Sequence, residues 1–364
     1  MTINIAYILL ALCSFLCALL TVPIALVFGR RFGFMDQPGE RKIHSTAIIR
    51  CGGVGIWLAF FVSFVGVLLA LPYVQDMDLF PSSLKVYIAN VGLMMPKIAA
   101  LLFGACVAFA TGLWDDKKLL SPRVKLFWQL VAIVPLPFVG ITANCFLGSA
   151  VLSGILTIFW VLLITNAFNL LDNMNGLSAG VAIIACFCFY LISSASGEWF
   201  MMAMFAIFAG SIAGFLPYNF PKAKLFMGDS GSLFIGYMLG TLSVLVSYYK
   251  VALPTALPVL SPLIILAVPL YDTLSVMWIR YRAGQPLMKG DRNHISHRLE
   301  ALGFSRTGAV VMVWALSLAV GVGAVNLRSL ALPGALIAVS QIVLWFVIFH
   351  IVERHANARI RSRE

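Results

Sequence analysis

The chain has 364 residues, of which 61% are hydrophobic and 11% are charged, and its mean hydropathy is +0.98. A soluble domain carries about 25% charged residues, so this composition excludes an ordinary soluble protein and indicates a chain embedded in lipid. The net charge of +11 fits basic loops on one membrane face in contact with anionic headgroups. We therefore expect membrane lipid, and no nucleic acid, as a partner.

Long apolar runs follow one another along the chain. A helix that crosses a bilayer needs roughly 20 apolar residues, and lipid cannot satisfy an irregular backbone. Eleven runs meet this requirement, at residues 4–28, 53–72, 97–113, 124–142, 147–165, 178–195, 199–216, 231–249, 256–279, 308–326 and 331–352. We predict an all-α, polytopic integral membrane protein with about eleven transmembrane helices, folded as a single membrane domain over residues 1–364.

The basic residues fall almost entirely in alternate loops. With the N-terminus outside, 21 of the 25 Lys and Arg residues lie on the inner side, and the exceptions are Lys85, Lys97, Lys250 and Arg328. Cytoplasmic loops concentrate Lys and Arg, so we expect a cytosolic C-terminus and a multi-pass protein of the inner (plasma) membrane. The cytosolic loops are then 30–52, 114–125, 166–177, 217–232 and 280–307. They also hold the clusters of Asp, Asn and His, so the active site is expected to face the cytosol.

The first two of these loops combine basic and acidic residues. Loop 30–52 contains Arg41-Lys42-Ile-His44 and then Arg50-Cys-Gly-Gly. Loop 114–125 contains Asp115-Asp116-Lys-Lys and, further on, Lys125. The adjacent carboxylates either end a solvated helix, balanced by the two lysines that follow, or share a divalent cation that relieves their repulsion. Mg²⁺ suits the second interpretation because it prefers oxygen ligands and keeps positions for water and phosphate.

The third loop is rich in amides and continues directly from an apolar run. Asn166, Asn169 and Asp172 are spaced so that they form one polar stripe on a helix, and Asn175-Gly follows. Helix capping alone would need one such residue, whereas this segment has five. Amide side chains offer both donors and acceptors, which suits a nucleobase edge or a sugar.

The fourth and fifth loops contain groups suited to phosphate. Asp229 lies among small residues just before an apolar helix, either as a simple helix cap or at a helix N-terminus that binds a phosphate or a metal–phosphate unit. The fifth loop places His294 and His297 three residues apart, with Arg292 and Arg298 able to fork onto phosphate oxygens. The alternative is that this loop is basic only because it lies on the cytoplasmic side of the membrane. The pair of histidines favours a functional role over that alternative.

Acids, amides, histidines and cations on one membrane face are the usual components of phosphoryl transfer, which depends on positioning and charge stabilisation. The membrane setting implies that one substrate is a lipid. If this lipid is a phosphate monoester, its second pKa of about 6 leaves it largely ionised at neutral pH. Direct attack of the lipid phosphate on a diphosphate substrate is therefore chemically reasonable, and a general base is not required.

These motifs resemble those of the polyprenyl-phosphate N-acetylhexosamine-1-phosphate transferase family, which also contains the phospho-N-acetylmuramoyl-pentapeptide transferases. They occur in the same order over roughly residues 30–300. The resemblance implies a multi-helix enzyme that transfers a sugar-1-phosphate from a UDP-sugar to undecaprenyl phosphate and releases UMP, as the first membrane step of cell-envelope polysaccharide synthesis. It also implies Mg²⁺ as cofactor, with Mn²⁺ as a substitute.

The resemblance further assigns roles to individual residues. Asp229 corresponds to the main metal ligand, with Asn169 nearby, while Asp115, Asp116 and Asp172 correspond to acids close to the metal and the polyprenyl phosphate. Lys125 resembles a lysine that contacts the pyrophosphate, and Asn175 stands where the family contacts uridine. The residues expected to bind the sugar and phosphates are Arg41, Lys42, His44, Arg50, Arg292 and Arg298. The resemblance also implies catalytic roles for His294 and His297, in the loop that holds the sugar and phosphates, and for the acids Asp115, Asp116, Asp172 and Asp229.

Two positions depart from the family pattern. Asn175 replaces an Asp that many bacterial members carry, which removes an acid role there but still permits pairing with uracil. Ser296 replaces a His commonly found beside the position of His297, which leaves His294 and His297 as the candidates. The first motif is more similar to the N-acetylhexosamine branch than to the muramoyl-pentapeptide branch.

Other readings remain at this point. A phospho-N-acetylmuramoyl-pentapeptide transferase is the nearest alternative, and a lipid diphosphate phosphatase would use the same cation with water as nucleophile. A lipid transporter or flippase would place its polar residues near the bilayer midplane and in repeated halves, whereas these motifs lie at the ends of the predicted spans. The apolar spans also permit two copies to pair as a homodimer.

Overall fold

The structure, a computed structural model, describes residues 3–36, 47–75, 85, 91–143, 145–249, 253–286 and 293–361. The first half of the chain forms α1 (Ile3–Phe32), β1 (Met35–Asp36), β2 (Ile48–Arg50), α2 (Gly52–Gln75), α4 (Val91–Lys117), α5 (Pro122–Ile133), α6 (Pro135–Phe138) and α7 (Ala150–Leu171). The second half forms α8 (Leu177–Ser196), α9 (Trp199–Asn219), β3 (Leu225–Phe226), α10 (Gly228–Leu245), η1 (Leu257–Leu260), α11 (Ser261–Ile265), α12 (Ala267–Arg282), α13 (Ile295–Ala301), α14 (Arg306–Asn326) and α15 (Leu332–Arg361). The predicted helical, polytopic membrane architecture is confirmed.

The predicted number of about eleven spans is not confirmed. Within the described residues, eight helices are long and apolar enough to cross a membrane, or nine if the bent pair Leu257–Ile265 and Ala267–Arg282, which turns by 65°, is one span. The predicted span 124–142 is instead two short helices, because Pro135 and Pro137 interrupt the helical hydrogen bonds. The predicted span 231–249 corresponds to α10, whose first turn is small and polar.

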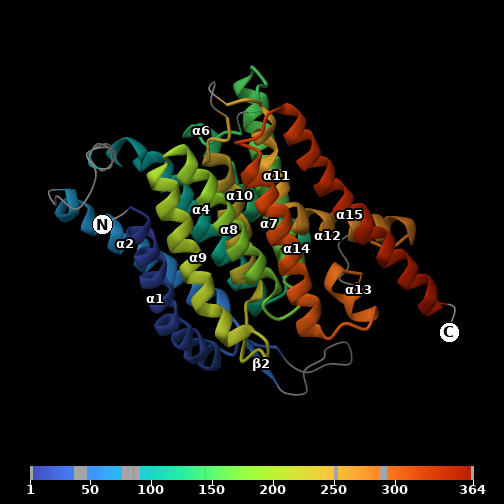
Figure 1. Ribbon diagram of the computed structural model, residues 1–364. Coiled ribbons are helices and arrows are strands. Elements are labelled where there is room, and N and C mark those ends of the chain that lie inside the picture. Colours follow the sequence, from blue (N-terminus) through green and yellow to red (C-terminus); the bar gives the residue numbers. More distant parts are fainter. Residues whose placement is uncertain are drawn as a thin grey trace.

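Helix α10 lies at the centre of the bundle, surrounded by α4, α7, α2 and α8 (Figure 1). Its residues from Gly228 to Ser243 are all buried. Helix α15 crosses one edge of the bundle diagonally (Figure 1). Most of its apolar side chains up to Ile351 are exposed. A helix that other helices surround needs no lipid-facing stripe, which explains how α10 can begin with polar residues and still lie inside a membrane protein.

A small three-stranded sheet was not expected from the sequence. Its order is β1-β2-β3, with Met35 opposite Ile49 in an antiparallel pair and Ile49 opposite Leu225 in a parallel pair. Strands of two or three residues are too short to give a detectable alternation of apolar and polar residues. The sheet joins the first loop to the segment that leads into α10, and so it brings Arg50 beside the start of α10.

Glycines allow three helix ends to meet at this point. A Cβ on Gly53 would lie 2.2 Å from the backbone nitrogen of Gly231, and one on Gly112 would lie 2.2 Å from the carbonyl oxygen of Asp229. Gly228 has φ of +73°, in the left-handed region that other residues rarely adopt. The starts of α2 and α10 and the end of α4 are therefore in backbone contact.

This contact predicts the outcome of a paired substitution. Gly112→Ala forces the end of α4 away from α10, and we expect the free energy of unfolding to fall by about 1–3 kcal/mol. Gly66→Ala is the matched control in α2, where an added Cβ meets nothing within 4 Å, and it should be neutral or slightly stabilising because Ala favours a helix. Denaturant titration of both variants in mixed micelles measures the difference. Equal stability of the two variants would contradict the close contact.

Candidate active site

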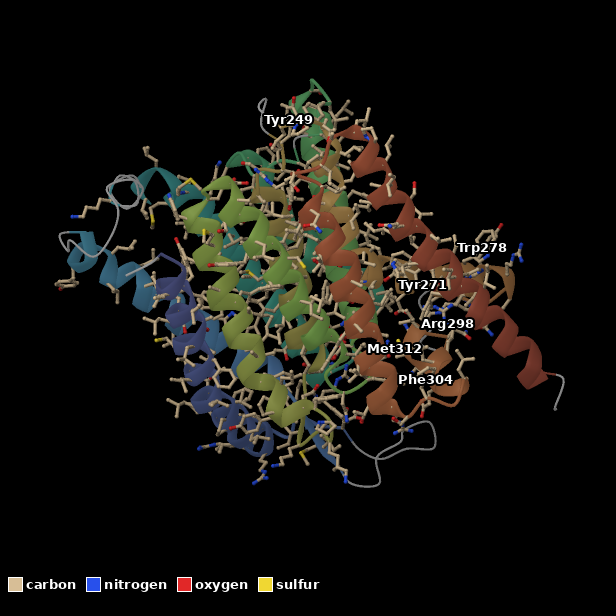
Figure 2. The ribbon with its side chains drawn as sticks, viewed as in Figure 1. Tyr249, Tyr271, Trp278, Arg298, Phe304 and Met312 are labelled. Carbon is tan, nitrogen blue, oxygen red and sulfur yellow. The ribbon has the colours of Figure 1, made fainter. Side chains whose placement is uncertain are left out.

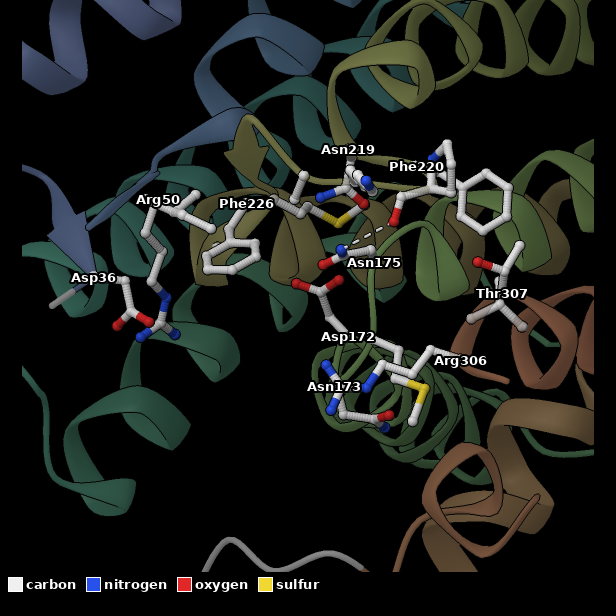
Figure 3. Close-up of a pocket in the computed structure, with 18 of the residues that line it drawn as sticks. Asp36, Arg50, Asp172, Asn173, Asn175, Asn219, Phe220, Phe226, Arg306 and Thr307 are labelled. Atoms are coloured by element: carbon white, nitrogen blue, oxygen red, sulfur yellow. Dashed lines mark hydrogen bonds between the residues drawn. The ribbon is translucent and has the colours of Figure 1, made fainter. Parts of the chain in front are cut away.

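One polar cavity opens where the helix ends meet. It has a volume of about 760 Å³ and lies between the sheet and the ends of α7, α9, α10 and α14, with one side chain from α13. Its polar lining consists of Asp36, Asp172, Asp229, Asn169, Asn173, Asn175, Asn219, Arg50, Lys222, His297 and Arg306. Figure 3 shows Arg50 and Asp36 at one end, Arg306 and Thr307 at the other, and Asp172 and Asn175 between them. The volume is in the range of small-molecule sites, and the mixed charges suit a polar, anionic ligand.

Asp229 is held by cations on both of its carboxylate oxygens. Arg50 Nη2 donates to Oδ1 at 2.6 Å, and Lys125 Nζ donates to Oδ2 at 2.5 Å. Lys125 also lies 2.9 Å from Oδ2 of Asp115. These ion pairs connect β2, α4, α5 and α10 at a point where Asp229 is only 8% exposed. The structure thus brings together Asp229, Asp115, Lys125 and Arg50, which the sequence assigns to one site, while their roles stay predictions.

The neighbouring acids Asp115 and Asp116 face different surroundings. Asp116 accepts the backbone N–H groups of Asp229 and Ser230 at 2.8 and 2.9 Å and lies 3.1 Å from Arg50 Nε. Its side chain is completely buried. Asp116 therefore caps the N-terminus of α10 from another helix, where a negative charge is favoured. Asp115 instead pairs with Lys125, and its Oδ1 accepts the N–H of Leu120 at 2.7 Å.

The polar stripe of the third loop divides between packing and the cavity. Asn166 pairs with the amide of Gln129 at 2.9 and 3.3 Å and so ties α7 to α5. Asn169 lines the cavity, and its Nδ2 donates to Ser232 Oγ at 2.9 Å, which directs its carbonyl oxygen away from that hydroxyl. Asp172 ends α7 and points into the cavity (Figure 3).

The charge state of Asp172 depends on its surroundings. Burial raises the pKa of this carboxyl to about 7, with Arg50 opposing the shift and the carboxylates of Asp229 and Asp116 adding to it. Proton uptake by Asp172 near neutral pH is therefore linked to the charge of the adjoining ion-pair cluster.

Asn219 organises the wall of the cavity and was not singled out by the sequence. Its Oδ1 accepts the N–H of Gly176 at 2.5 Å, and its Nδ2 donates to the carbonyl of Leu225 at 2.9 Å. It thereby joins the start of α8 to strand β3. Next to it, the amide of Asn175 donates to the carbonyl of Pro221 at 3.2 Å (Figure 3). A buried asparagine at a helix end gives no signal of its own in a single sequence.

The two histidines of the fifth loop occupy different environments. His297 lines the cavity, and its Nδ1 lies 3.5 Å from Glu300. His294 is buried, does not line the cavity, and places Nδ1 2.7 Å from Oδ2 of Asp272 in α12. Asp272 also accepts the N–H of Ile295 at 2.6 Å, so it fixes the start of α13.

Arg298 also packs against α12 rather than lining the cavity. Its Nη2 donates to Ser275 Oγ at 2.8 Å, and its guanidinium lies over the ring of Tyr271 (Figure 2). The roles predicted for His294 and Arg298 stay predictions. Arg41, Lys42, His44 and Arg292 lie outside the described residues.

The acids of the site fit a magnesium ion in donor type and in charge. Four carboxylates, those of Asp115, Asp116, Asp172 and Asp229, adjoin two cations, Arg50 and Lys125. Above the raised pKa of Asp172, the four carboxylates exceed the two cations by two negative charges, which matches one divalent cation. Carboxylate and amide oxygens are also the ligands that Mg²⁺ prefers. Among the described residues, no three His, Cys, Asp or Glu side chains already surround a common point.

The capping role of Asp116 predicts a large loss of stability. Asp116→Ala leaves two N–H groups of α10 and Nε of Arg50 without their buried acceptor, and we expect the free energy of unfolding to fall by about 3 kcal/mol or more. Glu300→Ala is the control, because the Arg306–Glu300 pair is 51% and 33% exposed, and exposed pairs contribute about 0–1 kcal/mol. Denaturant titration compares them. A loss for Asp116→Ala no greater than that for Glu300→Ala would refute the cap.

Comparison with known proteins places this site in a family. Residues 98–247 match the family described as glycosyl transferase family 4. The chain is 30% identical, over 358 residues, to the probable undecaprenyl-phosphate N-acetylglucosaminyl 1-phosphate transferase of Bacillus subtilis, covering 96% of this chain and 92% of the relative. It is 30% identical to the decaprenyl-phosphate N-acetylglucosaminephosphotransferase of Mycolicibacterium smegmatis, over 79% of this chain and 74% of that one. This chain belongs to glycosyl transferase family 4.

Proposed function

We propose that this protein transfers N-acetylglucosamine-1-phosphate from a UDP-sugar to undecaprenyl phosphate and releases UMP. The observation that carries the proposal is the carboxylate of Asp229, which lines a polar cavity at one end of an apolar bundle and is held between Arg50 and Lys125. The names of the relatives from Bacillus and Mycolicibacterium support a polyprenyl-phosphate acceptor and an N-acetylglucosamine group. They favour this branch over a phospho-N-acetylmuramoyl-pentapeptide transferase.

The reaction is a displacement at phosphorus. An oxygen of the lipid phosphate attacks the phosphorus that carries the sugar, and the bond from that phosphorus to the oxygen bridging it to the uridine phosphate breaks. UMP leaves with the bonding electrons, and the product is a sugar linked to the lipid through a diphosphate. The attacking oxygen is already ionised at neutral pH, so no protein group has to remove a proton from it.

The side chains of the site would neutralise the charge of the substrate phosphates and orient the substrate for the displacement. Arg50 is fixed by strand β2 and by two carboxylates, so it offers a guanidinium at a constant position for phosphate oxygens. The amide of Asn175 lies where it can meet the edge of a base. His297 and Arg306 line the cavity and Lys222 adds a further cation, which suits the remaining phosphate and sugar oxygens.

Asp229 and Asn169 would hold a divalent cation at the edge of this cavity, and the cation would supply charge neutralisation at the diphosphate. Both side chains line the cavity, and both offer the oxygen ligands that Mg²⁺ or Mn²⁺ accepts. The positions of Asp115 and Asp172 keep the surrounding field negative enough to attract such an ion.

We also propose that the cavity faces the cytosol from the inner membrane. Site residues lie at the starts of α2, α8 and α10 and at the ends of α4 and α7, so consecutive helices meet at one membrane face. The loops on this face carry 21 of the 25 Lys and Arg residues by the sequence assignment, which is the cytoplasmic signature. The same placement at helix ends argues against a transporter, whose binding site lies near the midplane.

A release assay separates the remaining functions. Purified protein with UDP-N-acetylglucosamine, undecaprenyl phosphate and Mg²⁺ should release UMP only when the lipid is present, and it should form a lipid-linked diphosphate sugar. Other UDP-sugars in the same assay should react more slowly. Inorganic phosphate as the product would indicate a phosphatase, and the absence of any product with intact substrates would leave a transporter or flippase.

Chelation and one substitution test the cation and its ligand. EDTA should abolish UMP release and Mg²⁺ or Mn²⁺ should restore it.

Asp229→Asn should lower turnover by about 100-fold or more, since it removes a charge that acts in the transition state, while size-exclusion chromatography shows a folded protein. Glu198→Gln is an isosteric control at the other end of the bundle, where Glu198 accepts the N–H of Ser247. Full activity in EDTA, or in Asp229→Asn, would contradict the assignment.

A further inference from the structure

The ammonium group of Lys125 lies between two carboxylates. Nζ lies between Oδ2 of Asp229 at 2.5 Å and Oδ2 of Asp115 at 2.9 Å, and these oxygens come from two different helices. The side chains of Asp115 and Asp229 are only 4% and 11% exposed. Two nearly buried carboxylates this close repel each other unless a positive charge lies between them.

We infer that Lys125 is an exchangeable cation: it bridges Asp115 and Asp229 in the protein without a bound divalent ion, and an entering divalent cation displaces its ammonium group from both carboxylates. The inference rests on the proposed function, because it requires that Asp229 bind the cation. It adds that Lys125 competes with the metal, and that release of this lysine accompanies metal binding.

The two cations on Asp229 differ in how firmly they are held. Arg50 lies in a paired strand and contacts Asp116 through Nε and Asp229 through Nη2. A planar fork held at two sites resists movement. Lys125 lies in the first turn of α5, and its side chain is 21% exposed. Its ammonium group is at the end of a flexible four-carbon chain. A lysine can therefore leave its position without disturbing the helix that carries it.

The charge of the cluster favours this exchange. A divalent ion in place of the ammonium group adds one positive charge to a cluster with more carboxylates than cations. It also allows closer approach, since Mg²⁺ binds oxygen at about 2.0–2.1 Å. Asp229 lines the cavity whereas Lys125 does not. Once displaced, the ammonium group becomes available to phosphate oxygens, which the bridged arrangement prevents.

Binding of Mn²⁺ without any nucleotide tests the competition. Free Mn²⁺ is measured by electron paramagnetic resonance in the full-length, metal-stripped protein in detergent. Lys125→Gln should bind Mn²⁺ about tenfold more tightly than the wild type, a change equal to ~1.4 kcal/mol. Lys118→Gln removes an equal charge from an exposed lysine nearby and should change the affinity less than about twofold, because exposed charges are screened.

The outcomes distinguish the exchange from the metal site itself. Asp229→Asn should lose this Mn²⁺ binding, both alone and together with Lys125→Gln. If Asp229→Asn leaves Mn²⁺ binding unchanged, the proposed metal site is wrong. If binding depends on Asp229 but Lys125→Gln binds Mn²⁺ no more tightly than the wild type, the metal site stands and the exchange is wrong.

A second measurement needs no variant. Mild acetylation of the wild-type protein, read by peptide mass spectrometry, should leave Lys125 protected without divalent ions and modify it when Mn²⁺ is saturating. Lys118 should react equally in both conditions. Equal protection of Lys125 with and without Mn²⁺ would overturn the exchange even if the Lys125→Gln variant failed to fold.

Discussion

The N-terminus of α10 is a polar helix end enclosed inside a bundle suited to lipid, and the site follows from this constraint. The first N–H groups of a helix have no partner within the helix, and no lipid group can satisfy them. Asp116 accepts two of them. Its own buried charge then requires a cation, which Arg50 supplies while also reaching Asp229. Strand pairing beside α10 holds Arg50 in place. Thus the contacts that satisfy a helix end also assemble a charged cluster.

Much of this site could be predicted from the sequence. Placing a polar group in lipid costs free energy, so the positions of polar residues in such a chain indicate where a functional site lies. Asp229, Asp172, Asn169, Asn175, Arg50 and His297 were all singled out, and all six line one cavity. The helical bundle and the shared membrane face follow from hydropathy and from the alternation of basic loops. The metal and the individual catalytic roles stay predictions, since placement alone does not test them.

The sequence does not show which charged side chains form ion pairs with one another. Arg50 and Asp229 are 179 residues apart, and their contact depends on a sheet too short to leave a pattern. Neighbouring residues such as Asp115 and Asp116 look equivalent in a motif, yet one pairs with Lys125 and the other caps a helix. Apolar composition also does not show that paired prolines divide 124–142 into two short helices.

The balance of charge at the site explains why it combines a fixed cation with a movable one. Several carboxylates in a poorly solvated place would destabilise the fold if no cation adjoined them. A second arginine held as firmly as Arg50 would neutralise them permanently, and it would then exclude any other ion from Asp229. A lysine on a flexible stem stabilises the same carboxylates and still yields to a doubly charged competitor. The pairing of Arg50 with Lys125 at one carboxylate therefore reconciles a stable bundle with the proposed metal site.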